Sequence, residues 1–269
     1  MICLQRKIHN TMLVVYIDQT LYKENSNVFD SLFSTFLLRK FVPQNKNSMF
    51  ISSIHSSIKT NRKTQYEILC DTSYKGWVLQ LIGLLEDWYY DVIKCTIIHG
   101  SCVVLNDKSI LIVGERKAGK TTLTGYLTIK KDATYLDDDC IYILDDTYTG
   151  FNMPISVRNN IDDLNEENTV CDSLDGEKIN RKLFITSNRI TEIPKIDIII
   201  FPNYNENGIN SIIQIKNSNL YNKVLNNVRH SRDCKTLFVD IGILVKNSNA
   251  YQINYTNSAN AYSLIESVL

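Results

Sequence analysis

Short apolar runs alternate with polar turns along the whole chain, a pattern typical of an α/β fold in which helices and strands share one core. Helical spacing of apolar residues predicts helices at residues 28–41, 73–93, 220–228, 235–245 and 258–269, of which 235–245 is rich enough in β-branched residues to suit a strand instead. Strands are predicted at residues 12–17, 49–54, 65–70, 96–105, 109–113, 134–136, 140–144, 153–157, 182–186, 196–201, 209–215 and 251–255. The acidic segment 159–176 predicts a mobile surface loop.

One turn between a predicted strand and a predicted helix carries a phosphate-binding motif. It reads Gly114-Glu115-Arg116-Lys117-Ala118-Gly119-Lys120-Thr121 and matches G-x-x-x-x-G-K-[ST]. The backbone N–H groups of such a turn, at a helix N-terminus, point toward a phosphate chain. We therefore predict nucleoside triphosphate binding, with Lys120 reaching the β and γ phosphates and the Thr121 hydroxyl coordinating Mg²⁺.

Three carboxylates, Asp137 to Asp139, follow the strand predicted after the loop helix. Ligands of an open α/β sheet bind at this kind of edge, so one carboxylate could hold Mg²⁺ while another accepts a proton from an attacking hydroxyl. The alternative is a solvated turn. His99 precedes the loop and could orient a carboxylate or touch a phosphate, although a lone histidine is more often a satisfied core residue.

The amino-acid composition argues against several classes of binding partner. The 29 Lys and Arg residues balance 29 Asp and Glu residues, so no overall field attracts nucleic acid or an anionic membrane. Seven cysteines lack a C-x-x-C pair, and the four histidines do not flank them at zinc-ligand spacing, which indicates buried, reduced thiols. No apolar run approaches the ~18 residues of a membrane span. We expect a soluble cytoplasmic protein with no nucleic-acid or membrane partner.

The order of three stretches, 97–100, 110–123 and 135–142, resembles the C-terminal kinase domain of bacterial HPr kinase/phosphorylase. It is more similar still to the HPr-kinase-related proteins of gene clusters for modified peptides, including lasso peptides. The resemblance runs from about residue 95 to 158, and a closing strand and helix extend it over 75–269. It implies an α/β, P-loop kinase domain of the PEP carboxykinase-like type with a mixed central sheet.

The resemblance implies site roles by position. His99 would lie in the active site, and Gly114 to Thr122 would bind ATP. Asp138 is the preferred base for a seryl or threonyl hydroxyl, and Asp139 would support it or hold Mg²⁺ together with Thr121. Because true HPr kinases are hexamers, a homo-oligomer is expected as well.

The sequence has one further match to the family pattern and two departures from it. Pro154-Ile-Ser-Val-Arg158 resembles a proline-containing strand that ends in a basic residue, which implies that Arg158 contacts phosphate. Lys117 stands where the family loop usually has an additional glycine, and it could restrict the loop or add a cation. The Glu-x-Arg-Gly signature of true HPr kinases is absent, which argues against phosphorolysis and against HPr as the substrate, and affects simple ATP-dependent kinase activity less.

Three functions are therefore open. The first is an Mg-ATP-dependent kinase for a Ser/Thr hydroxyl on a peptide or small protein, in particular a ribosomally made modified peptide. The second is a kinase for a free amino acid or another small hydroxyl substrate. The third is a non-catalytic accessory protein that binds peptide in a nucleotide-dependent way. Residues 93–269 would form the nucleotide-binding domain, and the α+β region 1–92 would bind peptide by strand addition or cap that domain.

Overall fold

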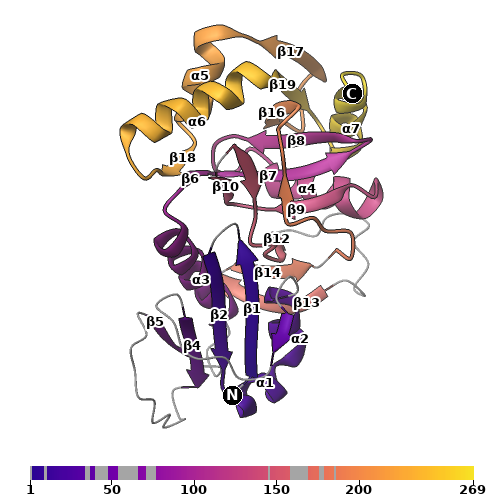
Figure 1. Ribbon diagram of the computed structural model, residues 1–269. Coiled ribbons are helices and arrows are strands. Elements are labelled where there is room, and N and C mark those ends of the chain that lie inside the picture. Colours follow the sequence, from indigo (N-terminus) through magenta and orange to yellow (C-terminus); the bar gives the residue numbers. More distant parts are fainter. Residues whose placement is uncertain are drawn as a thin grey trace. The chain divides into compact units, whose positions relative to one another are not determined.

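The structure is a computed structural model that describes residues 2–8, 11–33, 37–39, 48–53, 66–70, 77–144, 146–157, 169–175, 179–184 and 186–269. The chain divides into two compact units (Figure 1). The first comprises Met1–Ile93 together with Thr169–Leu183, and the second comprises Lys94–Asn168 together with Phe184–Leu269. The chain thus returns to the first unit at residues 169–183, after residues 94–168 of the second unit.

The first unit contains a five-stranded sheet with the order β3-β1-β2-β4-β5. Its elements are β1 (Ile2–Ile8), β2 (Thr11–Ile17), α1 (Gln19–Glu24), α2 (Ser26–Leu32), β3 (Leu37–Arg39), β4 (Ser48–Ser53), β5 (Tyr66–Cys70), α3 (Trp77–Ile93), β13 (Thr169–Asp175) and most of β14 (Ile179–Phe184). Strand β2 supplies much of the core, since its residues 13–17 are almost entirely buried. Helix α3 buries Trp88 completely, as its apolar pattern predicts.

Two predictions for the first unit are wrong. The helix expected over 28–41 ends at Leu32, and residues 37–39 instead form β3. β3 pairs with β1, a strand that we did not predict, and this non-local pairing overrides the helical spacing of the apolar residues. The loop expected over 159–176 includes β13, which lies next to β14 in a sheet and packs against α3.

The second unit is a mixed α/β fold around a six-stranded sheet with the order β17-β19-β16-β8-β7-β9. Its sheet strands are β7 (Gly100–Leu105), β8 (Lys108–Val113), β9 (Thr134–Asp137), β16 (Ile198–Tyr204), β17 (Ser211–Ile215) and β19 (Asn249–Tyr255). Strands β8, β16 and β19 are parallel neighbours, whereas β7, β9 and β17 join antiparallel. The predicted hairpin before the loop is confirmed, and its two turn residues, Asn106 and Asp107, have the positive φ angles of a tight hairpin.

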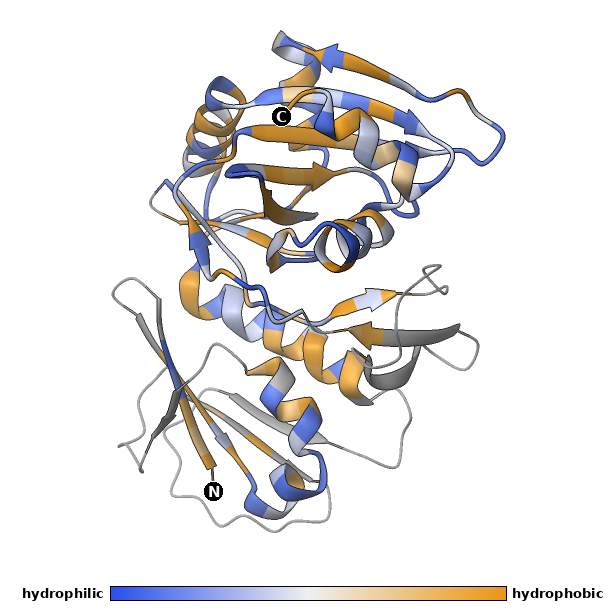
Figure 2. Cartoon of the chain, turned by 90° about the vertical axis from the view of Figure 1, so that its right-hand side faces the viewer, coloured by the Kyte–Doolittle hydropathy of each residue, from blue (hydrophilic) through white to orange (hydrophobic). Residues whose placement is uncertain are grey.

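Helices cover both faces of this sheet. On one face α4 (Lys120–Lys130) and α7 (Ser258–Glu266) pack on every second residue of β8 and β16, beginning with Ile110 and Ile198. On the other face α5 (Asn217–Leu225) and α6 (Cys234–Asn247) pack on the alternate residues, beginning with Leu111 and Ile199. The central strands are accordingly mostly orange in Figure 2, the colour of hydrophobic residues. A strand buried on both faces reads as a continuous apolar run.

A second, five-stranded sheet packs into the same core as α5 and α6, with the order β15-β11-β10-β6-β18. Its strands are β6 (Thr96–Ile98), β10 (Ile141–Leu144), β11 (Thr147–Thr149), β15 (Glu192–Ile193) and β18 (Val228–His230), and the short β12 (Ile155–Val157) lies outside both sheets. The segment 235–245 is helical, as predicted first, because Asp233 caps α6 by accepting the backbone N–H of Thr236.

Two further expectations concern the chain as a whole. Of the described cysteines, Cys3, Cys95, Cys102 and Cys140 are buried, as expected, whereas Cys234 is exposed. Within the described ranges, none of the helices is both long enough and apolar enough to span a bilayer.

Candidate functional site

The phosphate-binding motif forms the turn between β8 and α4, which is the strand–turn–helix context that it requires. Gly119, at the helix N-cap, has φ 94°, and Lys117 has φ 73°. Alternation of left-handed and right-handed residues turns backbone N–H groups into a concavity that favours anions. Lys117 therefore occupies a left-handed backbone conformation. Glycine adopts this conformation without strain, whereas a residue with a Cβ atom, such as lysine, does not.

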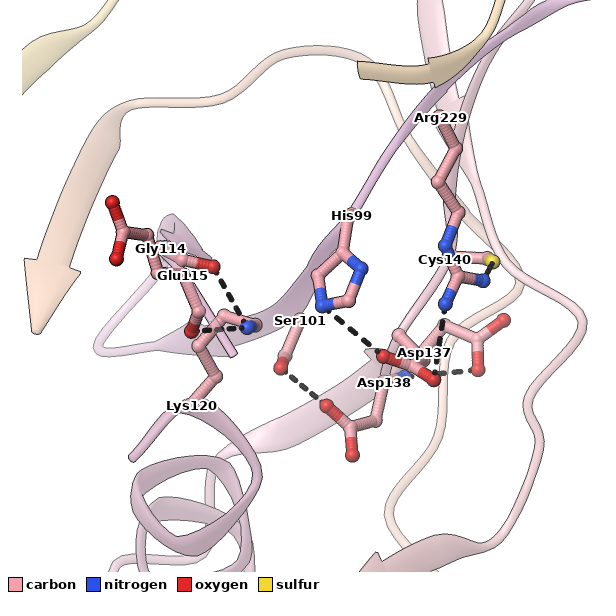
Figure 3. Close-up of polar contacts among 10 residues, drawn as sticks. His99, Ser101, Gly114, Glu115, Lys120, Asp137, Asp138, Cys140 and Arg229 are labelled. Atoms are coloured by element: carbon pink, nitrogen blue, oxygen red, sulfur yellow. Dashed lines mark hydrogen bonds and ion pairs between the residues drawn. The ribbon is translucent and has the colours of Figure 1, made fainter. Parts of the chain in front are cut away.

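Lys120 lies under this loop as the first residue of α4. Its Nζ donates to the carbonyl oxygens of Gly114 at 2.8 Å and of Glu115 at 3.1 Å (Figure 3). These contacts use two of the three donors of the ammonium group. Burial lowers the pKa of Lys120, and the negative charges of Asp139 and Asp138 act in the opposite direction. The ammonium is thus held at the loop, within the field of the acidic turn, residues Asp137 to Asp139.

Asp137 is a structural member of the acidic turn. Its carboxylate is buried and accepts the backbone N–H groups of residues 151–153, the last two at 3.2 and 3.1 Å, as well as the N–H of Asp138 at 3.0 Å. A Cβ atom at Gly150 would lie only 2.6 Å from the Asp137 Cβ, so the turn packs closely around the carboxylate. Its oxygens thus accept hydrogen bonds from backbone donors and from the Tyr135 hydroxyl at 3.5 Å, so the carboxylate anchors the turn.

Asp138 is a buried carboxylate that faces the loop. It accepts a hydrogen bond from the Ser101 hydroxyl on β7, and a second hydrogen bond, from Thr121, favours its ionised form. Burial first, and then the charge of Asp139, raise the pKa of Asp138 to about 6. Lys120 partly offsets that rise. A carboxylate with this pKa is ionised at neutral pH and is still basic enough to accept a proton.

Asp139 differs from Asp138 in being exposed, over 54% of its side chain. One of its oxygens lies 3.4 Å from His99 Nε2, and the other lies 3.4 Å from Arg229 Nη2. Arg229 also donates to Cys140 Sγ at 2.8 Å. Asp139 has φ 78°, a left-handed conformation that aspartate tolerates better than most residues. Asp138 and Asp139 therefore contact different groups although they are adjacent in the chain.

His99 is held mostly neutral by its surroundings. Burial is the main cause that lowers the pKa of His99, and the positive charges of Lys120, Arg229 and Arg116 add to it. Only Asp139 raises it. The backbone N–H of His99 donates to the Asn227 carbonyl at 2.7 Å, which fixes the residue between β6 and β7. A neutral imidazole beside Asp139 can orient that carboxylate by donating a hydrogen bond.

The structure therefore brings His99, Lys120, Thr121, Asp138 and Asp139 into one site, with Gly114 to Thr122 forming its loop. The proposed roles of these residues are untested. Arg158 lies outside the described residues. Within the described ranges, no group of three or more His, Cys, Asp or Glu side chains could hold a metal ion by itself.

Sequence reasoning missed two residues of the site. Ser101 lies on β7, whereas His99 lies at the bend between β6 and β7, so the period of two within one strand does not relate the two residues. Arg229 comes from β18, far along the chain, and reaches Asp139 because β18 pairs with β6. No local pattern around residue 229 signals that contact.

Comparisons with known proteins add little. No protein-family model matches the sequence, and the curated proteins contain no match either. Among solved structures, the HPr(Ser) kinase/phosphatase from Coxiella burnetii aligns with 64% of this chain and 95% of its own, at 11% identity and a TM-score of 0.31. A TM-score this low supports no inference, so functional assignment depends on the loop and the acidic turn themselves.

Proposed function

We propose that this protein is an Mg-ATP-dependent kinase that transfers a phosphoryl group to a seryl or threonyl hydroxyl of a peptide or small protein. The second unit would be its catalytic domain, a P-loop kinase domain of the HPr kinase, PEP carboxykinase-like type. The observation that carries the proposal is the position of Asp138, a buried carboxylate with a raised pKa beside Lys120 and Thr121.

A base in that position suits attack by a hydroxyl. In the transfer the acceptor oxygen bonds to the γ-phosphorus, the bond from that phosphorus to the bridging oxygen breaks, and ADP leaves. Asp138 takes the hydroxyl proton. Hydrogen bonds from Ser101 and Thr121 hold its carboxylate in place. Lys120 stabilises negative charge on the phosphates, the largest contribution in most phosphoryl transfers.

The residues present fit ATP and Mg²⁺. The left-handed Lys117 and Gly119 shape the loop for phosphate, and the oxygen donors of Thr121 and Asp139 are the hard ligands that Mg²⁺ prefers. Mg²⁺, when bound, would neutralise charge on the β and γ oxygens. Asp138 hydrogen-bonds to Thr121, so its carboxylate lies next to one of the two residues that would hold Mg²⁺.

The acceptor is proposed from the sequence resemblance to HPr-kinase-related proteins of modified-peptide gene clusters. A second candidate function is a kinase for free serine or another small hydroxyl substrate. Asp139 is 54% exposed and Arg229 is 34% exposed, and neither value distinguishes a peptide acceptor from a small one. Residues 1–92 are proposed to bind a peptide acceptor or to cap the catalytic domain, and the protein is proposed to act in the cytoplasm.

The decisive experiment measures transfer from γ-labelled ATP in the presence of Mg²⁺. Peptides encoded by neighbouring genes and free serine are the two acceptors, buffer alone is the blank, and intact mass identifies any phosphorylated product. A phosphopeptide supports the main proposal, phosphoserine supports the second, and peptide binding that depends on nucleotide without covalent phosphate indicates an accessory protein.

Asp138→Asn tests the proposed base. Removal of a general base typically lowers the rate by about 100-fold or more, while nucleotide binding through the loop is retained. Asp107→Asn, in the exposed turn of the β7–β8 hairpin, is the matched control and should transfer phosphate like the wild type. Full transfer by Asp138→Asn to every accepted substrate would contradict the proposed mechanism.

A further inference from the structure

Three parallel strands of the six-stranded sheet end beside one another at the edge that carries the phosphate loop. β8 leads into the loop, β16 ends at Tyr204 and β19 ends at Tyr255, which pairs with Tyr204 across the two strands. Ligands of α/β sheets bind outside the carboxyl ends of parallel strands. The two tyrosines therefore stand where the remainder of a nucleotide would extend from its phosphates.

Tyr255 is packed against the loop itself. Its side chain is almost fully buried, and its hydroxyl donates to the Ala118 carbonyl at 3.5 Å. A Cβ atom at Gly119 would overlap that hydroxyl, so the loop and Tyr255 are in contact at the residue before Lys120. The position of the Tyr255 ring is thus tied to the conformation of the phosphate loop.

Tyr204 differs from Tyr255 in being exposed. It is 49% exposed, although it lies at the end of a strand that is otherwise buried up to Pro202. Its ring centroid is 5.7 Å from that of Tyr255, with the planes tilted by 58°. This tilted packing is favourable for aromatic pairs and fixes one side of the Tyr204 ring. A Cβ atom built at Gly119 would lie 3.6 Å from the Cβ of Tyr204, so Tyr204 adjoins the loop.

We propose that Tyr204 is the stacking surface for the base of the bound nucleotide, and that Tyr255 positions both this ring and the loop. The proposal rests on the nucleotide site proposed above and adds the residue that holds the nucleoside end. Every base presents a π-face, so this contact favours nucleotides over bare polyphosphate without selecting among bases.

Binding of ATP and of inorganic tripolyphosphate by the full-length protein, measured by calorimetry, tests the proposal. Tyr204→Ala should weaken ATP binding about tenfold, the size typical of one base–aromatic stack, and leave tripolyphosphate binding unchanged. Tyr204→Phe should bind ATP like the wild type. Tyr204→Leu keeps apolar cover over Tyr255 but lacks a ring, so it should behave like Tyr204→Ala and provides the test if the alanine variant does not fold.

Phe238→Ala is the matched control, because Phe238 is an exposed aromatic residue, 57% exposed, on α6 rather than at the loop edge. It should leave both affinities unchanged. The proposal is overturned if Tyr204→Ala binds ATP as tightly as the wild type, or if ATP and tripolyphosphate weaken by the same factor. A wild-type protein that binds tripolyphosphate as tightly as ATP also overturns it and leaves the phosphate site intact. A wild-type protein that binds neither probe overturns the proposed function itself.

Discussion

The phosphate loop and the acidic turn face each other in the second unit, yet they are assembled in different ways. Most polar contacts of the loop join residues at most six positions apart, such as Lys120 to the Gly114 and Glu115 carbonyls, and only Tyr255 and Asp138 add polar contacts from distant described segments. The acidic turn has partners from four separate segments: residues 99–101, Thr121 of α4, the backbone of 151–153, and Arg229. The loop is thus a local structure, whereas the acidic turn depends on the whole unit.

The difference in assembly predicts that the loop governs nucleotide binding and that the acidic turn governs phosphoryl transfer. Substitutions in the loop should act on nucleotide affinity and leave the fold intact, because few distant residues depend on the loop. Substitutions in the acidic turn should act on stability as well as on turnover, and in opposite directions for Asp137 and Asp138. Four variants test that contrast.

The largest effect is expected for Lys120→Ala. Loss of a preorganised charge at the phosphates should lower ATP affinity and turnover by about 100-fold or more, which calorimetry and the labelled-ATP assay measure. The unfolding free energy should change far less than the activity. Lys246→Ala, which removes an exposed lysine in the last turn of α6, outside the loop, is the control. ATP binding that survives in Lys120→Ala would contradict the assignment of the loop.

Asp137→Asn should destabilise the protein by about 3 kcal/mol, because an amide cannot accept all the backbone N–H groups that the buried carboxylate accepts. Urea denaturation monitored by circular dichroism measures the loss. Asp139→Asn removes the charge of an exposed neighbour and should change stability by only about 0.5 kcal/mol. Equal stability of the two variants would show that Asp137 does not anchor residues 151–153.

Asp138→Asn should instead stabilise the protein above pH 6, by about 2 kcal/mol after allowance for weakened hydrogen bonds. Because the pKa of Asp138 is raised to about 6 in the folded protein, compared with about 4 in an unfolded chain, the folded state holds a proton between these values that the unfolded state has released. The stability that this group contributes is therefore fully present below about pH 4 and is lost as the pH rises through 6. The gain in the variant should disappear by pH 4 in urea titrations.

The same pKa predicts how activity depends on pH. Transfer by the wild-type protein should fall as the pH drops below about 6, because a protonated Asp138 cannot accept the hydroxyl proton. A rate that stays constant from pH 7 to pH 5 would argue against Asp138 as the base.

The smallest effect is expected for Lys117→Gly. Relief of the left-handed conformation gains about 1–2 kcal/mol, and the greater freedom of glycine in the unfolded chain offsets about 0.5–1 kcal/mol, so we expect a net gain of about 0.5 kcal/mol. Comparison with Lys117→Ala separates backbone strain from charge. If both variants lose the same ATP affinity, Lys117 contributes a cation, and if only the glycine variant changes, the loop conformation matters.

Features that depend on neighbouring residues in the chain were predictable from the sequence. The phosphate loop, the hairpin before it and the buried strand β16 all lie where their patterns place them, because turn chemistry and side-chain alternation act over a few residues. The approach of Asp138 to the loop followed from a rule on strand ends, which holds because parallel strands share one carboxyl edge.

Only the tertiary structure decided how the three adjacent aspartates differ. Identical side chains in sequence became a buried anchor, a buried base candidate and an exposed ion-pair partner, according to which distant segments surround each carboxylate. The same holds for Arg229 and for β13, which returns to the first unit, because neither contact leaves a local trace in the sequence. Hydrogen bonding and burial set the role of a charged group, and both are properties of the folded chain.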